Sequence, residues 1–565
     1  MTNLTRLRFG DVCWEVRQDI APLLFDSRGL QLSHWLESGQ ASIVKSGPHR
    51  TVYRVQLEGQ SLYVKHFRVA DARAMLSQWA RLSRARREWN RAEQAMACAL
   101  PTITPLAIGE QRRAGLVFEN YLVTEGIEDV EPLDSFVQNA LPLHPEPRQG
   151  QIRRRLATGL AELVARFHEA GIVHPDLHAG NVLVRMRRSE QPELFLVDLQ
   201  EARLARSVGW SLSRTNLIAF GLFFLTVARR IDSARFLRRY LQLRFHLGVD
   251  FKVEARRLQV DLRRRALRFW RKLDYRCITN NRRFFYQNIG SAHGFAVSEL
   301  GRPAMQTMLS DPDAPFRCAA AVVLKASPSS NVVRLPLAMD GSRLKVIYKR
   351  FNCPKRFDAL RGMLHHSPAL RAWHAGHGLL IRRIPTPRPL AVMERLVGPL
   401  VRENYLITQA IPDSINLRDY LCEVLPSLEP EPRRRLARRL LEQLGTFIRK
   451  MHDRNISHRD MKASNFLLAP IGSNAESAQL CLIDLAGVKI WRRLPIGRCV
   501  QNLARVSVSL QSHGVFTRTD FLRLLFAYMP SARHSPERWK PMWRDVQTRS
   551  RLKIARNRKL ARPVA

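Results

Sequence analysis

A set of four polar residues, of three types, is present twice in the chain, in the same order and with nearly the same spacing. In each set a lysine is followed 111 residues later by an aspartate, then by an asparagine five positions on, and then by an aspartate after an apolar segment. The sets are Lys65, Asp176, Asn181 and Asp198, and Lys349, Asp460, Asn465 and Asp484. Phosphoryl transfer requires these groups: an ammonium that neutralises phosphate charge, oxygen ligands for Mg²⁺, and a carboxylate that takes the proton of the attacking hydroxyl.

The two sets belong to a longer internal repeat. Three pairs of segments are separated by the same 284 residues. They are "LYVKHF" (62–67) with "VIYKRF" (346–351), "ENYLVT" (119–124) with "ENYLITQ" (403–409), and "FHEAGIVHPDLHAGN" (167–181) with "MHDRNISHRDMKASN" (451–465). Because three matches share one offset, we interpret the chain as a tandem duplication of a single domain.

The elements that carry these residues follow one order in both copies. Alternating segments at Val52–Leu57 and Ser61–Phe67 predict a hairpin that carries Lys65. Long segments with helical periodicity follow at Ile152–Glu169 and Pro432–Asp453. "FLVDL" (195–199) and "CLIDL" (481–485) read as buried strands that end on an aspartate. Strands followed mainly by helices predict an α+β fold with two lobes per copy.

Composition and spacing predict five segments. These are an N-terminal extension (1–29), a first domain (30–245), a basic helical linker (246–309), a second domain (310–535) and a basic tail (536–565).

Several motifs resemble those of known kinases. "HRDMKASN" is similar to the H-R-D-x-x-x-x-N catalytic loop of protein-kinase-like enzymes, and "HPDLHAGN" to the variant loop of small-molecule and sugar kinases. Together with "IPTPRPLA" (384–391) and the two Asp-Leu strand ends, they resemble the bacterial lipopolysaccharide kinase family, which includes kinases of Kdo and heptose sugars. The resemblance implies two tandem protein-kinase-like domains, each with a small β-rich N-lobe and a helical C-lobe, that use ATP and Mg²⁺.

The resemblance also implies a role for each repeated residue. Asp176 and Asp460 correspond to catalytic bases, and Lys65 and Lys349 to lysines that contact the α- and β-phosphates. Glu88 corresponds to the partner of Lys65. The residues that would hold the metal are Asn181, Asp198, Asn465 and Asp484.

The chain departs from the kinase pattern at two places. The position that matches Glu88 in the second copy is Ala372, so the lysine–glutamate pair is missing there. Neither copy has a G-x-G-x-x-G loop before its lysine, so glycine amides that cradle phosphate are not visible. We expect His174 and His458 to support the catalytic loop rather than to act as bases.

The charge balance predicts anionic partners. The chain has 92 Lys and Arg against 49 Asp and Glu, a formal net charge of +43, which favours lipopolysaccharide or another anionic glycolipid as acceptor and an anionic membrane surface. Nucleic acid is disfavoured because the Arg-rich linker lacks aromatics in a stacking register. None of the eight cysteines forms a C-x-x-C pair, which argues against a zinc ribbon.

The chain is expected to be cytoplasmic and to attach peripherally to the inner membrane. Its longest apolar run, Leu217–Ala228, is shorter than the roughly 20 residues of a membrane-spanning helix and predicts a buried globular helix. The basic tail, with Trp539 and Trp543, fits attachment at a membrane interface. The sequence leaves the oligomeric state open.

The sequence therefore predicts an ATP-dependent kinase that phosphorylates a sugar hydroxyl of the lipopolysaccharide core or of a similar lipid-linked glycan. Two alternatives stay open. One is a nucleotide-binding pseudokinase scaffold at the membrane, because a duplicated copy is free to lose activity. The other is a Ser/Thr protein kinase, which "HRDMKASN" in the second copy favours.

Overall fold

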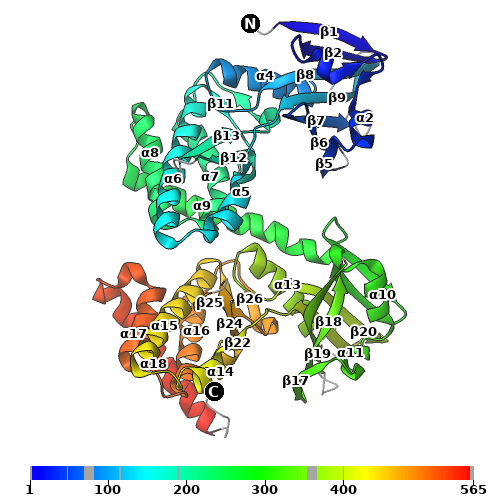
Figure 1. Cartoon of the computed structure of the whole chain (residues 1–565). Coiled ribbons are helices and arrows are strands. Elements are labelled where there is room, and N and C mark those ends of the chain that lie inside the picture. Colours follow the sequence, from blue (N-terminus) through cyan, green and yellow to red (C-terminus); the bar gives the residue numbers. More distant parts are fainter. Residues whose placement is uncertain are drawn as a thin grey trace. The chain divides into compact units, whose positions relative to one another are not determined.

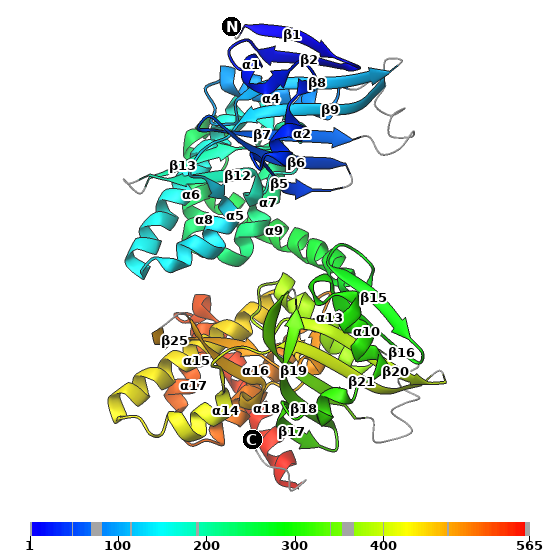
Figure 2. The ribbon, with the colours of Figure 1, turned by 45° about the vertical axis from the view of Figure 1, so that its right-hand side comes forward.

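A computed structural model describes most of the chain (Figures 1 and 2). The described residues are 3–47, 49–68, 82–113, 116–187, 191–339, 341–352, 366–398, 400–471 and 474–559. Contacts divide the chain into two compact units, Met1–Ala266 and Leu267–Ala565, which we call domain 1 and domain 2. Both combine a sheet-rich lobe with a helical lobe, which confirms the predicted α+β kinase-like fold and the duplication.

The sheet-rich lobe of domain 1 is built on seven antiparallel strands in the order β1-β2-β8-β9-β7-β6-β5. Its strands are β1 Leu4–Phe9, β2 Val12–Arg17, β5 Ala41–Ser46, β6 Arg50–Leu57, β7 Gln60–Arg68, β8 Pro105–Arg113 and β9 Leu116–Glu125. The predicted hairpin is β6–β7, in which Val52 pairs with Lys65. Trp14, Trp35 and Val64 belong to the core on one face of this sheet.

Domain 2 repeats this sheet with the same strand order, β15-β16-β20-β21-β19-β18-β17. Its strands are β15 Phe284–Ile289, β16 Ala292–Val297, β17 Val322–Ser327, β18 Ser330–Met339, β19 Ser342–Phe351, β20 Pro389–Val397 and β21 Leu400–Gln409. Val332 pairs with Lys349 as Val52 pairs with Lys65. The register therefore places the two lysines at equivalent points of the two sheets.

Equivalent helices pack on the two sheets, α4 (Arg84–Ala97) in domain 1 and α13 (Pro368–Ile381) in domain 2. Ser83 caps α4 by accepting a hydrogen bond from the amide of Arg86, and Ser367 caps α13 in the same way. The asparagine of each repeated "ENY" segment adds a second bond. Asn120 accepts from the amide of Ala85 at 3.0 Å, and Asn404 from that of Ala369 at 3.0 Å. The repeated segment thus fixes where each helix begins.

The helical lobe of domain 1 packs around the long helix α6 (Figure 1). Its main helices are α6 Glu146–Glu169, α7 Trp210–Val227, α8 Arg230–Leu243 and the first part of α9, a helix of residues Phe251–Asp274 that continues from Leu267 into domain 2. Two small sheets flank the segments that hold Asp176, Asn181 and Asp198. Their strands are β10 Glu131–Pro132, β12 Val182–Met186 and β13 Pro192–Leu196, and β11 Ile172–Val173 with β14 Arg203–Leu204.

The helical lobe of domain 2 has the matching elements. Its helices are α15 Pro430–Asp453, α16 Ile496–Gln511, α17 Arg518–Tyr528 and α18 Pro536–Lys559. Its small sheets are β22 Ile415–Asn416, β24 Phe466–Ile471 and β25 Asn474–Leu482, and β23 Ile456–His458 with β26 Val488–Ile490. In both domains the predicted buried strand ends two residues before its aspartate, Asp198 or Asp484.

The predicted segment boundaries are wrong at four places. Residues 4–17, expected in an extension, form β1 and β2 of the first sheet, and residues 284–297, expected in the linker, form β15 and β16 of the second. Both hairpins keep a turn glycine with positive φ, Gly10 (58°) and Gly290 (53°). The other strand residues have diverged, so the repeat was not visible there.

The predicted linker helix and the predicted basic tail both belong to folded domains. Helix α9 packs on α7, where Arg214 forms an ion pair with Asp261. Helix α18 packs on α16, with Val546 and Ser550 buried. Trp539 and Trp543 are half-buried against the core of domain 2. These two tryptophans are therefore part of the fold and do not form a free membrane anchor.

The long apolar run lies in α7, which by length and composition alone could also cross a membrane. Its buried residues are Ser213, Asn216, Leu217 and Phe220. Asn216 hydrogen-bonds to His168 of α6 at 2.8 Å and to the backbone carbonyl of His174. A buried polar side chain that ties the helix to two other segments supports a helix of the folded domain. Only 28 % of the apolar helix is buried, however, which differs from the buried helix that the sequence predicts.

The Arg382–Asp274 ion pair predicts a large loss of stability when one partner is removed. Both side chains are almost fully buried, and their two bonds are 2.5 and 2.8 Å long. We expect Arg382→Ala to destabilise domain 2 by about 3–5 kcal/mol, because it leaves the carboxylate of Asp274 buried without its partner. Urea unfolding of the full chain measures this change.

The exposed pair Arg434–Glu431 is the control. Arg434→Ala should change the unfolding free energy by less than about 1 kcal/mol. An equal effect of the two substitutions would contradict the buried-pair argument.

Candidate active sites

Lys65 lies on strand β7 and forms the predicted ion pair with Glu88 of α4, with 2.5 Å between Nζ and Oε1. Glu88 is fully buried, and burial raises the pKa of its carboxyl although the charge of Lys65 opposes this effect. The pair holds the helix and the lysine in one arrangement. It is the arrangement that positions a phosphate-binding lysine in protein kinases.

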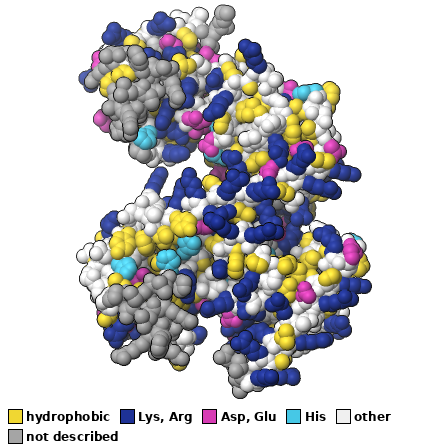
Figure 3. Space-filling view, turned by 180° about the vertical axis from the view of Figure 1, so that it is seen from behind, with side chains coloured by type: hydrophobic (Ala, Val, Ile, Leu, Met, Phe, Trp, Pro, Cys, Tyr) yellow, Lys and Arg dark blue, Asp and Glu magenta, His cyan; other side chains and the backbone are white. Residues whose placement is uncertain are grey.

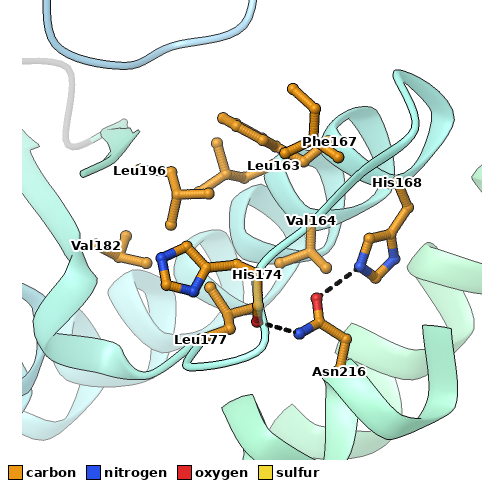
Figure 4. A pocket seen from close by; sticks show the side chains of 10 residues that line it. Leu163, Val164, Phe167, His168, His174, Leu177, Val182, Leu196 and Asn216 are labelled. Atoms are coloured by element: carbon orange, nitrogen blue, oxygen red, sulfur yellow. Dashed lines mark hydrogen bonds between the residues drawn. The ribbon is translucent and has the colours of Figure 1, made fainter. Parts of the chain in front are cut away.

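The catalytic loop of domain 1 is held from behind by buried polar groups (Figure 4). His174 Nε2 lies 3.0 Å from the backbone oxygen of Asp198, and Asn216 donates to the carbonyl of His174. The surrounding side chains of Leu163, Val182 and others leave a cavity of only about 10 Å³, roughly the space of one water. This region is packed support and not a binding pocket.

Domain 2 repeats the arrangement. His458 Nε2 lies 3.1 Å from the backbone oxygen of Asp484, and Asn502 donates to the carbonyl of His458 at 2.7 Å. Burial lowers the pKa of both histidines. Neutral, backbone-bound rings confirm the expectation that His174 and His458 support the loop.

The loop asparagine and the strand-end aspartate are brought together in each domain. The carbonyl of Asn181 accepts from the amide of Val197, next to Asp198, and that of Asn465 accepts from Ile483, next to Asp484. Both aspartates adopt left-handed backbone angles, with φ of 61° and 58°. Such strained conformations persist where the surrounding structure imposes them.

Each pair offers a fitting set of donors for Mg²⁺. The side-chain nitrogen of Asn181 donates to the carbonyl of Asp176 at 3.1 Å, and that of Asn465 to Asp460 at 2.6 Å. The amide oxygen is then the atom left for a metal, beside the Asp carboxylate. Two hard oxygen ligands completed by phosphates and water suit Mg²⁺. Within the described residues there is no cluster of three or more His, Cys, Asp and Glu side chains to hold a different metal.

Arg50 is a member of the first site that the sequence did not reveal. Its Nη1 lies 3.1 Å from both carboxylate oxygens of Asp198. Burial acts to raise the pKa of Asp198, but the charges of Lys65 and Arg50 outweigh it and hold the pKa below its ordinary value. A cation at the start of β6, in the hairpin that precedes the lysine strand β7, occupies the part of the sheet where kinases have a glycine-rich loop over the phosphates.

The charge arrangement of domain 2 is different. Ala372 occupies the position of Glu88, and Lys349 Nζ instead binds Asp484 Oδ1 at 2.8 Å. Burial acts to raise the pKa of Asp484, but Lys349 outweighs it and the pKa is lowered. Ser330 pairs with Phe351 as Arg50 pairs with Phe67, so a hydroxyl replaces the arginine.

The two candidate bases are open to solvent. The side chain of Asp176 is 79 % exposed and that of Asp460 is 53 % exposed. A basic side chain lies beside each: His178 Nε2 at 3.9 Å from Asp176, and Lys462 Nζ at 3.2 Å from Asp460. Both carboxylates are therefore accessible to an acceptor hydroxyl.

Comparison with known proteins agrees with this geometry. The model of the Lipopolysaccharide kinase (Kdo/WaaP) family matches residues 34–240 and 348–528. The chain belongs to the lipopolysaccharide kinase (Kdo/WaaP) family. Each matched segment contains one complete Lys, Asp, Asn and Asp set, so the family repeat coincides with the duplicated sites.

Individual proteins of the Kdo/WaaP family match only part of the chain, at 30 % identity or less. The chain is 30 % identical to the lipopolysaccharide core heptose(I) kinase WaaP of Escherichia coli strain K12 over 159 residues, which are 28 % of this chain and 58 % of that protein. It is 25 % identical to WaaP of Pseudomonas aeruginosa over 216 residues, 37 % of this chain and 79 % of that protein. The solved structure "WaaP in complex with acyl carrier protein" aligns at 22 % identity with a TM-score of 0.33, covering 43 % of this chain and 98 % of that one.

The Lys65–Glu88 pair predicts a pH-dependent loss of stability in Lys65→Met. Without the lysine, burial and the negative charge of Asp198 both act to raise the pKa of Glu88 and only the charge of Arg50 opposes them, so the folded pKa rises further above the unfolded value. A raised carboxyl pKa gives stability that is present at low pH and is lost as the pH rises towards the folded pKa. We expect the variant to be destabilised, relative to the unmodified chain, by about 3 kcal/mol more at pH 8 than at pH 5 in urea unfolding.

The control is Lys65→Met combined with Glu88→Gln, which has no carboxyl to titrate and should lose the additional pH dependence. If Lys65→Met lowers the free energy of unfolding by the same amount at both pH values, the pH dependence cannot be assigned to the carboxyl of Glu88.

Proposed function

We propose that the chain transfers the γ-phosphate of ATP to a sugar hydroxyl of the lipopolysaccharide core or of a similar lipid-linked glycan. Membership of the Kdo/WaaP family supports a kinase, and relatives named as heptose kinases support a sugar of lipopolysaccharide as acceptor. The observation that carries the proposal is the repeated site. In both domains the fold brings a strand lysine next to the strand-end aspartate, and the loop asparagine next to the same residue.

In this proposal Asp176 and Asp460 take the proton of the attacking hydroxyl as its oxygen bonds to the γ-phosphorus. The bond from that phosphorus to ADP breaks, and the new phosphate ester stays on the sugar. Lys65 and Lys349 neutralise phosphate charge, as Arg50 does in domain 1. Asn181 with Asp198, and Asn465 with Asp484, would hold Mg²⁺, which neutralises the charge that develops on the phosphates.

A second candidate applies to domain 2, namely nucleotide binding without transfer. Ala372 leaves Lys349 without a glutamate partner, and the lysine binds the metal-ligand candidate Asp484 instead. This arrangement supports lower turnover in domain 2 than in domain 1. The "HRDMKASN" loop of the same domain supports protein hydroxyls as alternative acceptors.

We further propose that the chain works at the cytoplasmic face of the inner membrane. Lys and Arg side chains spread over the face shown in Figure 3 and outnumber acidic ones there. Attraction to an anionic leaflet contributes about 1 kcal/mol for each basic residue near the surface. The charged surface, rather than a tryptophan anchor, carries this part of the proposal.

Transfer of label from γ-labelled ATP with Mg²⁺ to dephosphorylated lipopolysaccharide tests the reaction. We expect the intact chain to label the acceptor. Asp176→Asn should remove most of the label, because loss of a general base typically costs about 100-fold or more in turnover. The label that remains on the acceptor should disappear when Asp460→Asn is added.

The matched control is Asp545→Asn on the exposed surface of α18, which should leave the label unchanged. Loss of label in Asp460→Asn alone would assign turnover to domain 2 instead. If the intact chain labels Ser or Thr of proteins but no glycan, the sugar-kinase proposal is wrong.

Sedimentation with lipid vesicles tests the membrane proposal. We expect the chain to bind vesicles that contain phosphatidylglycerol but not vesicles of phosphatidylcholine alone. Binding should be lost at about 0.5 M salt, which screens exposed charges. Binding to both kinds of vesicle, or binding that resists salt, would contradict an electrostatic mode of attachment.

A further inference from the structure

The surroundings of the two candidate bases differ in charge at matched positions. Arg459 and Lys462 flank Asp460, whereas Pro175 and His178 occupy the same places beside Asp176. A third difference lies on the helix behind the loop. Asn216 and Asn502 make the same bonds to a loop carbonyl and to a histidine, so they align α7 with α16. Three residues further on, domain 2 has Arg505 and domain 1 has Ala219.

In domain 2 a fourth cation comes from the C-terminal helix α18. Lys553 interacts electrostatically with Arg505, Asp460 and Lys462, and Arg505 with Asp460 and Arg459. Lys462 itself lies 3.2 Å from Asp460. Residues from the loop around Asp460, from α16 and from α18 therefore lie within electrostatic range of one carboxylate.

The position of Lys553 is set by packing. One turn before it, Ser550 is 1 % exposed, and its hydroxyl lies 3.5 Å from the carbonyl oxygen of Ala504, the residue before Arg505. Val546, one turn earlier again, is also buried. The two basic side chains are thus presented by two helices, α16 and α18, that pack against each other.

Four cations around one carboxylate leave an excess of positive charge. Arg505 and Lys553 are both half-buried, and burial together with neighbouring cations lowers the pKa of each. Holding like charges together at a partly desolvated place is unfavourable unless an anion offsets them. Arginine and lysine are also the side chains that bind phosphate and carboxylate most strongly.

We propose that domain 2 takes an acceptor that already carries an anionic group, a phosphate ester or a carboxylate, close to the hydroxyl that reacts, and that Arg505 and Lys553 bind this group. The inference rests on the proposed function and deepens it. At the matched positions domain 1 offers Pro175, His178 and Ala219, and its acceptor does not require the neighbouring anion. The two domains therefore act on different acceptor sites.

The chemistry is the same transfer as before. The acceptor oxygen bonds to the γ-phosphorus, the bond from that phosphorus to ADP breaks, and the hydroxyl proton passes to Asp460. The anionic group of the acceptor takes no part in bond making. Arg505 and Lys553 act by placing the hydroxyl, so their loss should weaken acceptor binding more than turnover.

Kinetics of the full chain carrying Asp176→Asn test the proposal, because only domain 2 can then transfer. Three forms of lipopolysaccharide core oligosaccharide serve as acceptors: one with its phosphates and carboxylates, one dephosphorylated, and one dephosphorylated with its carboxylates reduced to alcohols. We expect Arg505→Gln and Lys553→Gln each to raise the acceptor KM about tenfold for an anionic acceptor, with kcat changed less than about twofold. The KM for ATP should stay unchanged.

The acceptor series identifies the anion. A higher KM after dephosphorylation alone supports a phosphate ester as the recognised group, and a higher KM only after reduction supports a carboxylate. With the fully neutral acceptor, Arg505→Gln and Lys553→Gln should have no further effect. Arg551→Gln, an exposed charge on the same helix, is the matched control and should change none of these values.

Three results would overturn the inference. The neutral acceptor could react as well as the anionic one, the two substitutions could raise the KM for ATP instead, or Arg551→Gln could have the same effect as Lys553→Gln. If the Asp176→Asn chain transfers no label, calorimetric binding of the phosphorylated oligosaccharide decides. Binding weakened about tenfold by Lys553→Gln supports the inference, and unchanged binding refutes it. Absence of transfer by the intact chain refutes the proposed reaction separately.

Discussion

The sites of both domains depend on one buried contact, the bond between a loop histidine and the backbone of the strand-end aspartate. His174 and His458 each bind the carbonyl of an aspartate held in a left-handed conformation. An asparagine on the next long helix fixes the same loop from the other side. These contacts tie the catalytic loop, the metal-ligand candidates and the helical core together, so the geometry of the site follows from the packing of the lobe.

Duplication kept this support and changed the charges in front of it. In domain 1, Glu88 holds Lys65, and Arg50 contacts Asp198. In domain 2 both partners are replaced, and Lys349 binds Asp484 directly. Around the candidate bases the difference is the opposite one, because Asp460 of domain 2 has basic neighbours that Asp176 of domain 1 lacks. Domain 1 thus has the more complete set of residues proposed to contact the phosphates. Domain 2 has the more basic surroundings of the candidate base that faces the acceptor.

The last long helix of each repeat accounts for part of the excess of basic residues. Helices α9 and α18 occupy equivalent places at the end of each repeat and are rich in arginine. Their buried faces pack on α7 and α16, while basic side chains line the rest of each helix. Much of the positive charge is therefore carried by elements of the folded domains, next to the helix that supports the catalytic loop, and not by a separate linker and tail.

The sequence by itself determined the duplication, the α+β kinase-like fold and the eight repeated residues, because catalytic groups must keep their type and their spacing along short loops. It also indicated the Lys65–Glu88 pair and the supporting role of the histidines. It did not show that residues 4–17 and 284–297 belong to the sheets, because strand positions accept many residues of similar size and polarity. Only the tertiary structure decided the places of Arg50, Arg505 and Lys553. These side chains reach their sites from distant elements, and only packing sets which of the many basic residues lie near Asp198 and Asp460.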